Sequence, residues 1–201
     1  MSRFIETIRV ENGIASLLER HQRRMGLTFE AFQKENSIDL KEVIHTLEVP
    51  SNGLFKWRLL YDLDGNFSSE LLPYQVFKFK DFQLVSDDNV DYHFKYEDRM
   101  VLNQLKAQAE AQEIIIVKHG KITDTSFSNL LFKKGEHWFT PKSFLLNGVQ
   151  RQYLLDEKKI REVEITLNNI AEFSHFQLIN SMNRMNERTI YPIDKIINLP
   201  R

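Results

Sequence analysis

The chain has 201 residues, enough for one large domain or two small ones with a buried core. With 42% apolar residues, 27% charged residues and a net charge of −1, it has the composition of a soluble globular protein and no charge bias toward nucleic acid or an anionic membrane. Its longest apolar run, Ile114–Val117, is far shorter than the roughly 20 residues of a membrane-spanning helix. Cysteine is absent, which excludes disulfides, thiolate catalysis and Cys-ligated zinc. Because no secretory signal opens the chain, we expect a cytoplasmic protein.

The first part of the chain is predicted to form strands joined by tight turns. Runs of β-branched and aromatic residues are bounded by Asn12-Gly13 and Asp64-Gly65, which are strong hairpin signals. The segments expected to be extended are 4–10, 55–61, 67–74 and 76–85.

A helix is expected to begin at Ser16, because Ser16 and Glu19 have the spacing of a capping box. On this helix Leu17, His21 and Arg24 recur at intervals that place them on one face. The two other helix starts expected in this region are Thr28 and Asp39.

The polar segment 86–89 is the expected boundary between a small N-terminal domain, 1–88, and a larger C-terminal domain, 89–201. After it, helices and antiparallel strands alternate. The predicted elements are a helix over 97–111, strands over 114–117, 121–123, 129–132 and 137–139, a helix over 149–157, and short strands with a short helix after 161. This mixture indicates an α+β protein with two lobes.

Four polar stretches could together hold an aldehyde cofactor with a phosphate tail. Such a site needs a lysine amine for the aldehyde, a carboxylate for a pyridine nitrogen, and an arginine with helix-opening N–H groups for phosphate. The stretches that offer these groups are 21–24, 95–99, 122–132 and 145–151. Each alone also fits a plainer role, such as a surface lysine or a turn cap. No pattern predicts a metal site, a Walker loop or a serine nucleophile elbow.

Taken in order, these stretches resemble the class IV aminotransferase family, the fold-type IV pyridoxal-phosphate enzymes. That family includes D-amino-acid and branched-chain aminotransferases and 4-amino-4-deoxychorismate lyase. The matching residues are Phe4–Arg9, Asn12-Gly13, Leu17–Arg24, Lys95 with Arg99, Ile122–Asp124 with Asn129, Thr140-Pro141 and Leu146–Arg151. The resemblance implies a two-lobe α+β fold like that of D-amino-acid aminotransferase, with pyridoxal 5'-phosphate (PLP) between the lobes of a homodimer subunit. Because this chain starts at the Phe-x-Glu-Thr stretch, a trimmed N-terminal lobe is expected.

The resemblance also implies the roles of single residues. Lys95 would attach the cofactor and transfer the proton during catalysis. Asp124 stands where the family usually has a glutamate on the pyridine nitrogen, and its side chain is shorter by one methylene.

The phosphate side of the site is implied in the same way. Arg24 would bind the phosphate, and the backbone N–H groups of Val149 and Gln150 would assist. Ser181 looks like the hydroxyl that lies on the phosphate side late in the chain.

Three functions remain open at this point. The segments 4–9 and 122–151 look closest to the lyase branch, which implies conversion of aminodeoxychorismate to pyruvate and 4-aminobenzoate for folate biosynthesis, through an external aldimine and proton abstraction by Lys95. The first alternative is a transaminase acting on D- or branched-chain amino acids. The second is a non-catalytic homodimeric binding protein of the same fold. In the first two cases the partner is a small-molecule amine, and in none is it a nucleic acid or a membrane.

Overall fold

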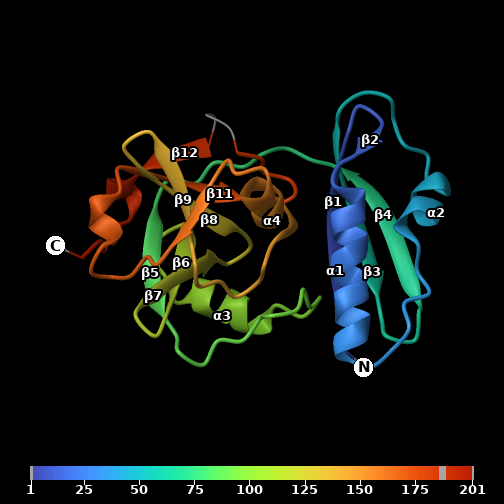
Figure 1. Ribbon diagram of the computed structural model, residues 1–201, viewed down its shortest axis with the longest axis horizontal. Helices are drawn as coiled ribbons and strands as arrows, with labels where there is room; N and C mark the ends of the chain where they lie inside the picture. The colour runs from blue at the N-terminus through green and yellow to red at the C-terminus, as the bar shows by residue number, and fades with distance from the viewer. Residues whose placement is uncertain (1, 186–188, 201) are drawn as a thin grey trace. The chain divides into compact units, whose positions relative to one another are not determined.

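The computed structural model describes residues 2–185 and 189–200 (Figure 1). These residues form two compact units. Unit 1 comprises residues up to 76 together with 94–98, and unit 2 comprises 77–93 and the residues from 99 onward. The division differs from the boundary expected after residue 88, because residues 77–88 include a strand that pairs within unit 2 and residues 94–98 return to unit 1. Strands and helices are mixed in both units, as expected for an α+β protein.

Unit 1 is an antiparallel sheet, with strand order β2-β1-β3-β4, that carries helix α1 (Figure 1). Both predicted hairpin turns are confirmed, since β1 pairs with β2 and β3 with β4. The elements are β1 (Phe4–Glu11), β2 (Ile14–Ala15), α1 (Leu18–Ala31), α2 (Leu40–His45), β3 (Leu54–Tyr61) and β4 (Phe67–Pro73). Alternate residues of β1 face inward and join Met25 and Phe29 of α1 in the core. This sheet therefore fixes β1 against the α1 face that carries the polar residues of interest.

Two of the predicted helix starts in unit 1 are wrong. Helix α1 begins at Leu18, and the residue before it, Leu17, has a left-handed backbone (φ 55°) and gives no side-chain cap. Ser16 is therefore not the N-cap residue of α1. Thr28 lies inside α1 and does not start a new helix. Its hydroxyl donates to the carbonyl of Arg24 one turn earlier. Asp39 caps α2 as predicted, and its carboxylate accepts from the N–H of Lys41 at 2.7 Å.

Unit 2 contains two sheets, one with strand order β5-β6-β7 and one with order β10-β9-β8-β11-β12. Its elements are β5 (Phe82–Ser86), α3 (Met100–Ala107), β6 (Glu113–Lys118), β7 (Lys121–Thr125), β8 (Asn129–Lys134), β9 (His137–Pro141), α4 (Val149–Asp156), β10 (Arg161–Val163), η1 (Ile170–Glu172), β11 (His175–Ile179), β12 (Ile190–Pro192) and η3 (Ile193–Lys195). The hairpins β6–β7 and β8–β9 are as predicted. The predicted strand over 76–85 and helix over 97–111 are shorter than expected.

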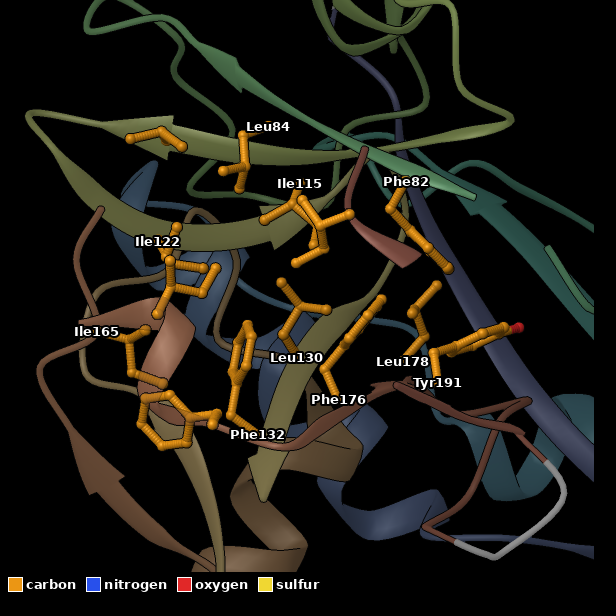
Figure 2. Close-up of a cluster of buried hydrophobic side chains, with 14 residues drawn as sticks. Phe82, Leu84, Ile115, Ile122, Leu130, Phe132, Ile165, Phe176, Leu178 and Tyr191 are labelled. Atoms are coloured by element: carbon orange, nitrogen blue, oxygen red, sulfur yellow. The ribbon is translucent and has the colours of Figure 1, made fainter. Parts of the chain in front are cut away.

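The two sheets of unit 2 share one apolar core (Figure 2). Phe82, Leu84 and Ile115 of the first sheet point toward Leu130 and Phe176 of the second (Figure 2). This core supports β7 and β8, the two strands that carry the polar residues described below. Within the described residues no helix combines the length and the apolar character that crossing a membrane requires.

Candidate active site

Glu6 of β1 is a fully buried carboxylate, and two side chains of α1 converge on it. Nδ1 of His21 lies 2.6 Å from Oε2 of Glu6. Arg24 donates from Nε to Oε1 at 2.8 Å and from Nη2 to Oε2 at 2.5 Å. The predicted common face of His21 and Arg24 is therefore confirmed. Sequence reasoning gave Glu6 no role, although a charged residue between Phe4 and Ile8 on the apolar face of a strand was a readable signal of a buried polar partner.

These contacts set the charges of the group. Burial raises the pKa of Glu6, but the charge of Arg24 and the hydrogen bonds from His21 and Arg24 outweigh it and lower that pKa to about 2. Burial lowers the pKa of His21, and the charges of Arg24 and Lys95 lower it further, against the opposing effect of Glu6. Glu6 is thus ionised at neutral pH, and the neutral His21 ring donates to it from Nδ1.

Lys95 belongs to unit 1 through the short segment 94–98. The N–H of Ile5 donates to the carbonyl of Lys95 at 2.9 Å, and Tyr96 forms a bridge with Phe4. The ring of Tyr96 stacks on that of Phe4 with centroids 5.2 Å apart, and Phe94 packs edge-on at 6.3 Å. The segment that carries the lysine is therefore attached to the same strand as Glu6, and the charge of Lys95 acts on His21. Unit 1 accordingly brings together two of the predicted site residues, Lys95 and Arg24.

Asp124 of β7 is a buried carboxylate of unit 2. Its Oδ2 accepts from the N–H groups of Leu145 and Leu146 at 3.0 and 2.9 Å, and its Oδ1 accepts from Nδ2 of Asn129 at 2.8 Å. Burial raises its pKa to about 6, although these bonds and the charge of Arg151 act in the opposite direction. The carboxylate is held in place by neutral donors, which orient it without supplying a full counter-charge.

The N-terminus of α4 adjoins Asp124 through Asn129. Gly148 is the N-cap of α4, and a Cβ at that position would lie 2.1 Å from Oδ1 of Asn129. Asn129 also donates to the carbonyl of Leu146 at 2.8 Å. The backbone N–H groups of Val149 and Gln150, the first two residues of α4, have no acceptor within the described part of the chain. A helix N-terminus with such N–H groups favours an anion.

Two further residues of unit 2, Ser181 and Arg151, lie in the segments around α4 and β11. Ser181 is half-buried in the loop that follows β11. Arg151, to which the sequence gave no separate role, is almost fully buried. Its Nη2 donates to the carbonyl of Pro141 at 3.0 Å and to Glu162 at 2.5 Å, so it fastens the start of α4 to the neighbouring strands. Unit 2 thus brings together Asp124, Val149 and Gln150 of the predicted site.

Comparison with known proteins gives one family for this arrangement. Residues 78–196 match the family model described as Amino-transferase class IV. An "Uncharacterized protein" of Haemophilus influenzae (strain KW20 Rd) is 35% identical over 182 residues, which cover 89% of this chain and 96% of that protein.

Solved structures share the fold. The structure named "putative 4-amino-4-deoxychorismate lyase" from Haemophilus somnus 129PT is 36% identical, with a TM-score of 0.86 over 92% of this chain and 98% of that one. The PLP-bound form of "a hypothetical aminotransferase" from Mycobacterium tuberculosis has 16% identity and a TM-score of 0.74, and the match covers 90% of this chain and 78% of that one. The expected fold is confirmed.

Proposed function

The chain belongs to the class IV aminotransferase family, and from this premise we propose that it is a PLP-dependent 4-amino-4-deoxychorismate lyase that releases pyruvate and 4-aminobenzoate. The observation that carries the proposal is the similarity to the Haemophilus somnus protein of that name, which extends over 98% of its chain at 36% identity. The proposal places the protein in folate biosynthesis in the cytoplasm, as a homodimer.

The groups present suit PLP chemically. Unit 1 offers an amine for the aldehyde at Lys95 and a guanidinium for the phosphate at Arg24. Unit 2 offers two backbone N–H groups at the start of α4 that have no acceptor in the described part of the chain, and a carboxylate whose pKa is raised by burial and whose direct donors are neutral. A carboxylate has about four lone-pair positions, and Asp124 uses three of them, so one remains for a protonated pyridine nitrogen.

Each residue then has a defined task. Lys95 would hold the aldehyde carbon through Nζ until the substrate amine takes its place there, and the freed Nζ amine would then take the proton from the substrate carbon that bears the amine. Asp124 would keep the pyridine nitrogen protonated, and the groups proposed to hold the phosphate are Arg24 and the first N–H groups of α4. The bound cofactor supplies an electron-withdrawing ring that stabilises negative charge at the reacting carbon. Ser181 would add a hydroxyl on the phosphate side.

The family description itself favours a second candidate, an aminotransferase for D- or branched-chain amino acids. The same lysine would serve it, because Lys95 would return the proton to the cofactor side instead of leaving the substrate to eliminate. The two activities therefore differ in the fate of the substrate rather than in the residues named above.

One assay separates the two candidates. PLP-loaded protein is incubated with aminodeoxychorismate, and pyruvate and 4-aminobenzoate are measured; in parallel it receives D- and branched-chain amino donors with 2-oxoglutarate. We expect equimolar pyruvate and 4-aminobenzoate, and none with Lys95→Ala. Amino transfer without pyruvate release would favour the aminotransferase, and no turnover of either kind would overturn both. Light scattering would test the homodimer.

A further inference from the structure

The proposed reaction uses Lys95, Arg24 and Asp124 but leaves the most deeply placed charge of unit 1 without a task. Glu6 has no exposed surface, yet it is an ionised carboxylate on a strand whose neighbouring inward residues, Phe4 and Ile8, are apolar. Burying a charge is costly unless its partners compensate. A leucine or valine would suit that face of the strand better, so the position calls for an explanation beyond packing.

The geometry around Glu6 constrains Arg24 specifically. Two nitrogens of the guanidinium, Nε and Nη2, each bond to a different oxygen of the carboxylate, at 2.8 and 2.5 Å. A bidentate pair of this kind fixes both the position and the plane of the guanidinium, which a single bond would not do. Arg24 itself is nearly buried, with 11% of its side chain exposed.

His21 acts on the other side of the same carboxylate. Its fully buried ring donates from Nδ1 to Oε2 at 2.6 Å, the oxygen that Nη2 of Arg24 also uses. His21 and Arg24 lie one turn apart on α1, so the helix holds both donors at a fixed spacing. The three side chains thus form a chain of support that runs from His21 through Glu6 to Arg24.

We propose that Glu6 is a positioning residue that orients the guanidinium of Arg24 for the phosphate group of the cofactor, with His21 fixing Glu6 in turn. The inference rests on the proposed function, because it needs a phosphate-bearing ligand at Arg24. A guanidinium held in one orientation before binding loses less freedom when the phosphate arrives, and affinity rises accordingly.

The test compares two ligands that differ only in the phosphate. The full-length apoprotein is titrated with PLP and with pyridoxal, and the affinities are followed by absorbance. Glu6→Gln keeps the size of the side chain but retains one acceptor where Glu6 has two. We expect it to weaken PLP about tenfold and to leave pyridoxal unchanged, since losing an oriented charge-assisted bond typically costs that much.

The sign of the effect separates positioning from simple electrostatics. Removing a negative charge beside Arg24 would strengthen the attraction for a phosphate dianion, so tighter PLP binding by Glu6→Gln would overturn the proposal. Equal weakening of PLP and pyridoxal would also overturn it, because that result describes a structural role. Glu70→Gln is the matched control: Glu70 pairs with Arg58 at 2.9 Å on the same sheet, and we expect no change for either ligand.

A double-mutant cycle links the effect to Arg24. In the Arg24→Ala background Glu6→Gln should weaken PLP by less than twofold, and an undiminished tenfold loss there would contradict the proposal. If Glu6→Gln does not fold, Glu6→Asp replaces it, because aspartate keeps the charge but moves the carboxylate away from Arg24 by one methylene. The same selective loss of PLP affinity is expected. Wild-type affinity of Glu6→Asp for PLP would overturn the proposal. A wild-type protein that binds PLP and pyridoxal equally would instead overturn the proposed phosphate site itself.

Discussion

Two buried carboxylates, Glu6 in unit 1 and Asp124 in unit 2, have pKa values that are shifted in opposite directions. Both are nearly or fully inaccessible to water, and burial raises the pKa of each. Glu6 ends at a pKa of about 2, because a guanidinium and an imidazole contact it directly. Asp124 ends at about 6, because its direct donors are two backbone N–H groups and an amide.

The two carboxylates differ in how far the neighbouring groups balance their negative charge. The charge of Glu6 is balanced inside unit 1, so that carboxylate is suited to holding Arg24 rather than a ligand. The charge of Asp124 is oriented but poorly balanced, so a cation brought beside it would be stabilised. A protonated pyridine nitrogen is such a cation, and this is the physical reason to assign the cofactor ring to Asp124.

The largest expected effect concerns Lys95 and tests whether unit 1 supplies the reactive amine. Lys95→Ala should abolish both turnover and covalent attachment of PLP. Borohydride reduction of the wild-type protein followed by peptide mapping checks the assignment, and the modified peptide should contain Lys95. Label on another lysine would contradict the assignment of the reactive amine to Lys95.

The next largest effect is expected at Asp124 of unit 2. Asp124→Asn keeps the shape and one acceptor but removes the charge, so PLP should remain bound while turnover falls by roughly two powers of ten. Cofactor occupancy and rate are measured on the same preparation.

The conservative variant is the control for that change. Asp124→Glu should retain most of the activity, because it restores a carboxylate of the length usual in the family. Full activity of Asp124→Asn would mean that the reaction does not need the charge of Asp124, and it would contradict the assignment of the pyridine nitrogen to this carboxylate.

A smaller effect is expected at Arg24. Arg24→Ala should weaken PLP about ten- to a hundredfold, because it removes charge-assisted hydrogen bonds, while the rate at saturating PLP changes less. Arg23→Ala is the matched control, since the next residue of a helix points about 100° away. Equal losses of PLP affinity in the two variants would contradict the prediction that Arg24, and not Arg23, faces the phosphate.

The smallest effect is a pH dependence of stability in the apoprotein. The folded pKa of Asp124 is raised from 3.8 to about 6, so its contribution to stability is largest at low pH and is lost as pH rises through that range. The expected decrease in the free energy of unfolding between pH 4.5 and 6 is about 1.5 kcal/mol. The lowered pKa of Glu6 acts in the opposite direction and below this window, where stability is lost as pH falls toward 2.

Urea unfolding of wild type and Asp124→Asn at several pH values measures the effect as a difference. The variant should lack the pH dependence that Asp124 contributes, so wild type should lose stability relative to the variant as pH rises from 4.5 to 6. If the difference in the free energy of unfolding stayed constant from pH 4.5 to 6, the pKa of Asp124 would not be raised in the folded protein.

The sequence was most informative where a local pattern has one structural solution. The hairpins at Asn12-Gly13 and Asp64-Gly65 and the common face of His21 and Arg24 were readable, because turn chemistry and helical spacing are local. The start of α1 was misjudged, since Leu17 adopts a left-handed backbone that no capping pattern reveals. The partner of Arg24 could not be read from the helix, because Glu6 reaches it only through the packing of β1 on α1.

The pKa of Asp124 with and without cofactor is the most direct measure of whether the pyridine ring lies beside this carboxylate. Carbon-13 carboxyl resonances of labelled aspartate, with Asp124 assigned from Asp124→Asn, are followed through a pH titration. In the apoprotein Asp124 should titrate near 6. With PLP bound, a protonated pyridine nitrogen beside the carboxylate should lower that pKa below about 4. A pKa that stays near 6 or rises on binding would contradict the assignment of the cofactor ring to Asp124.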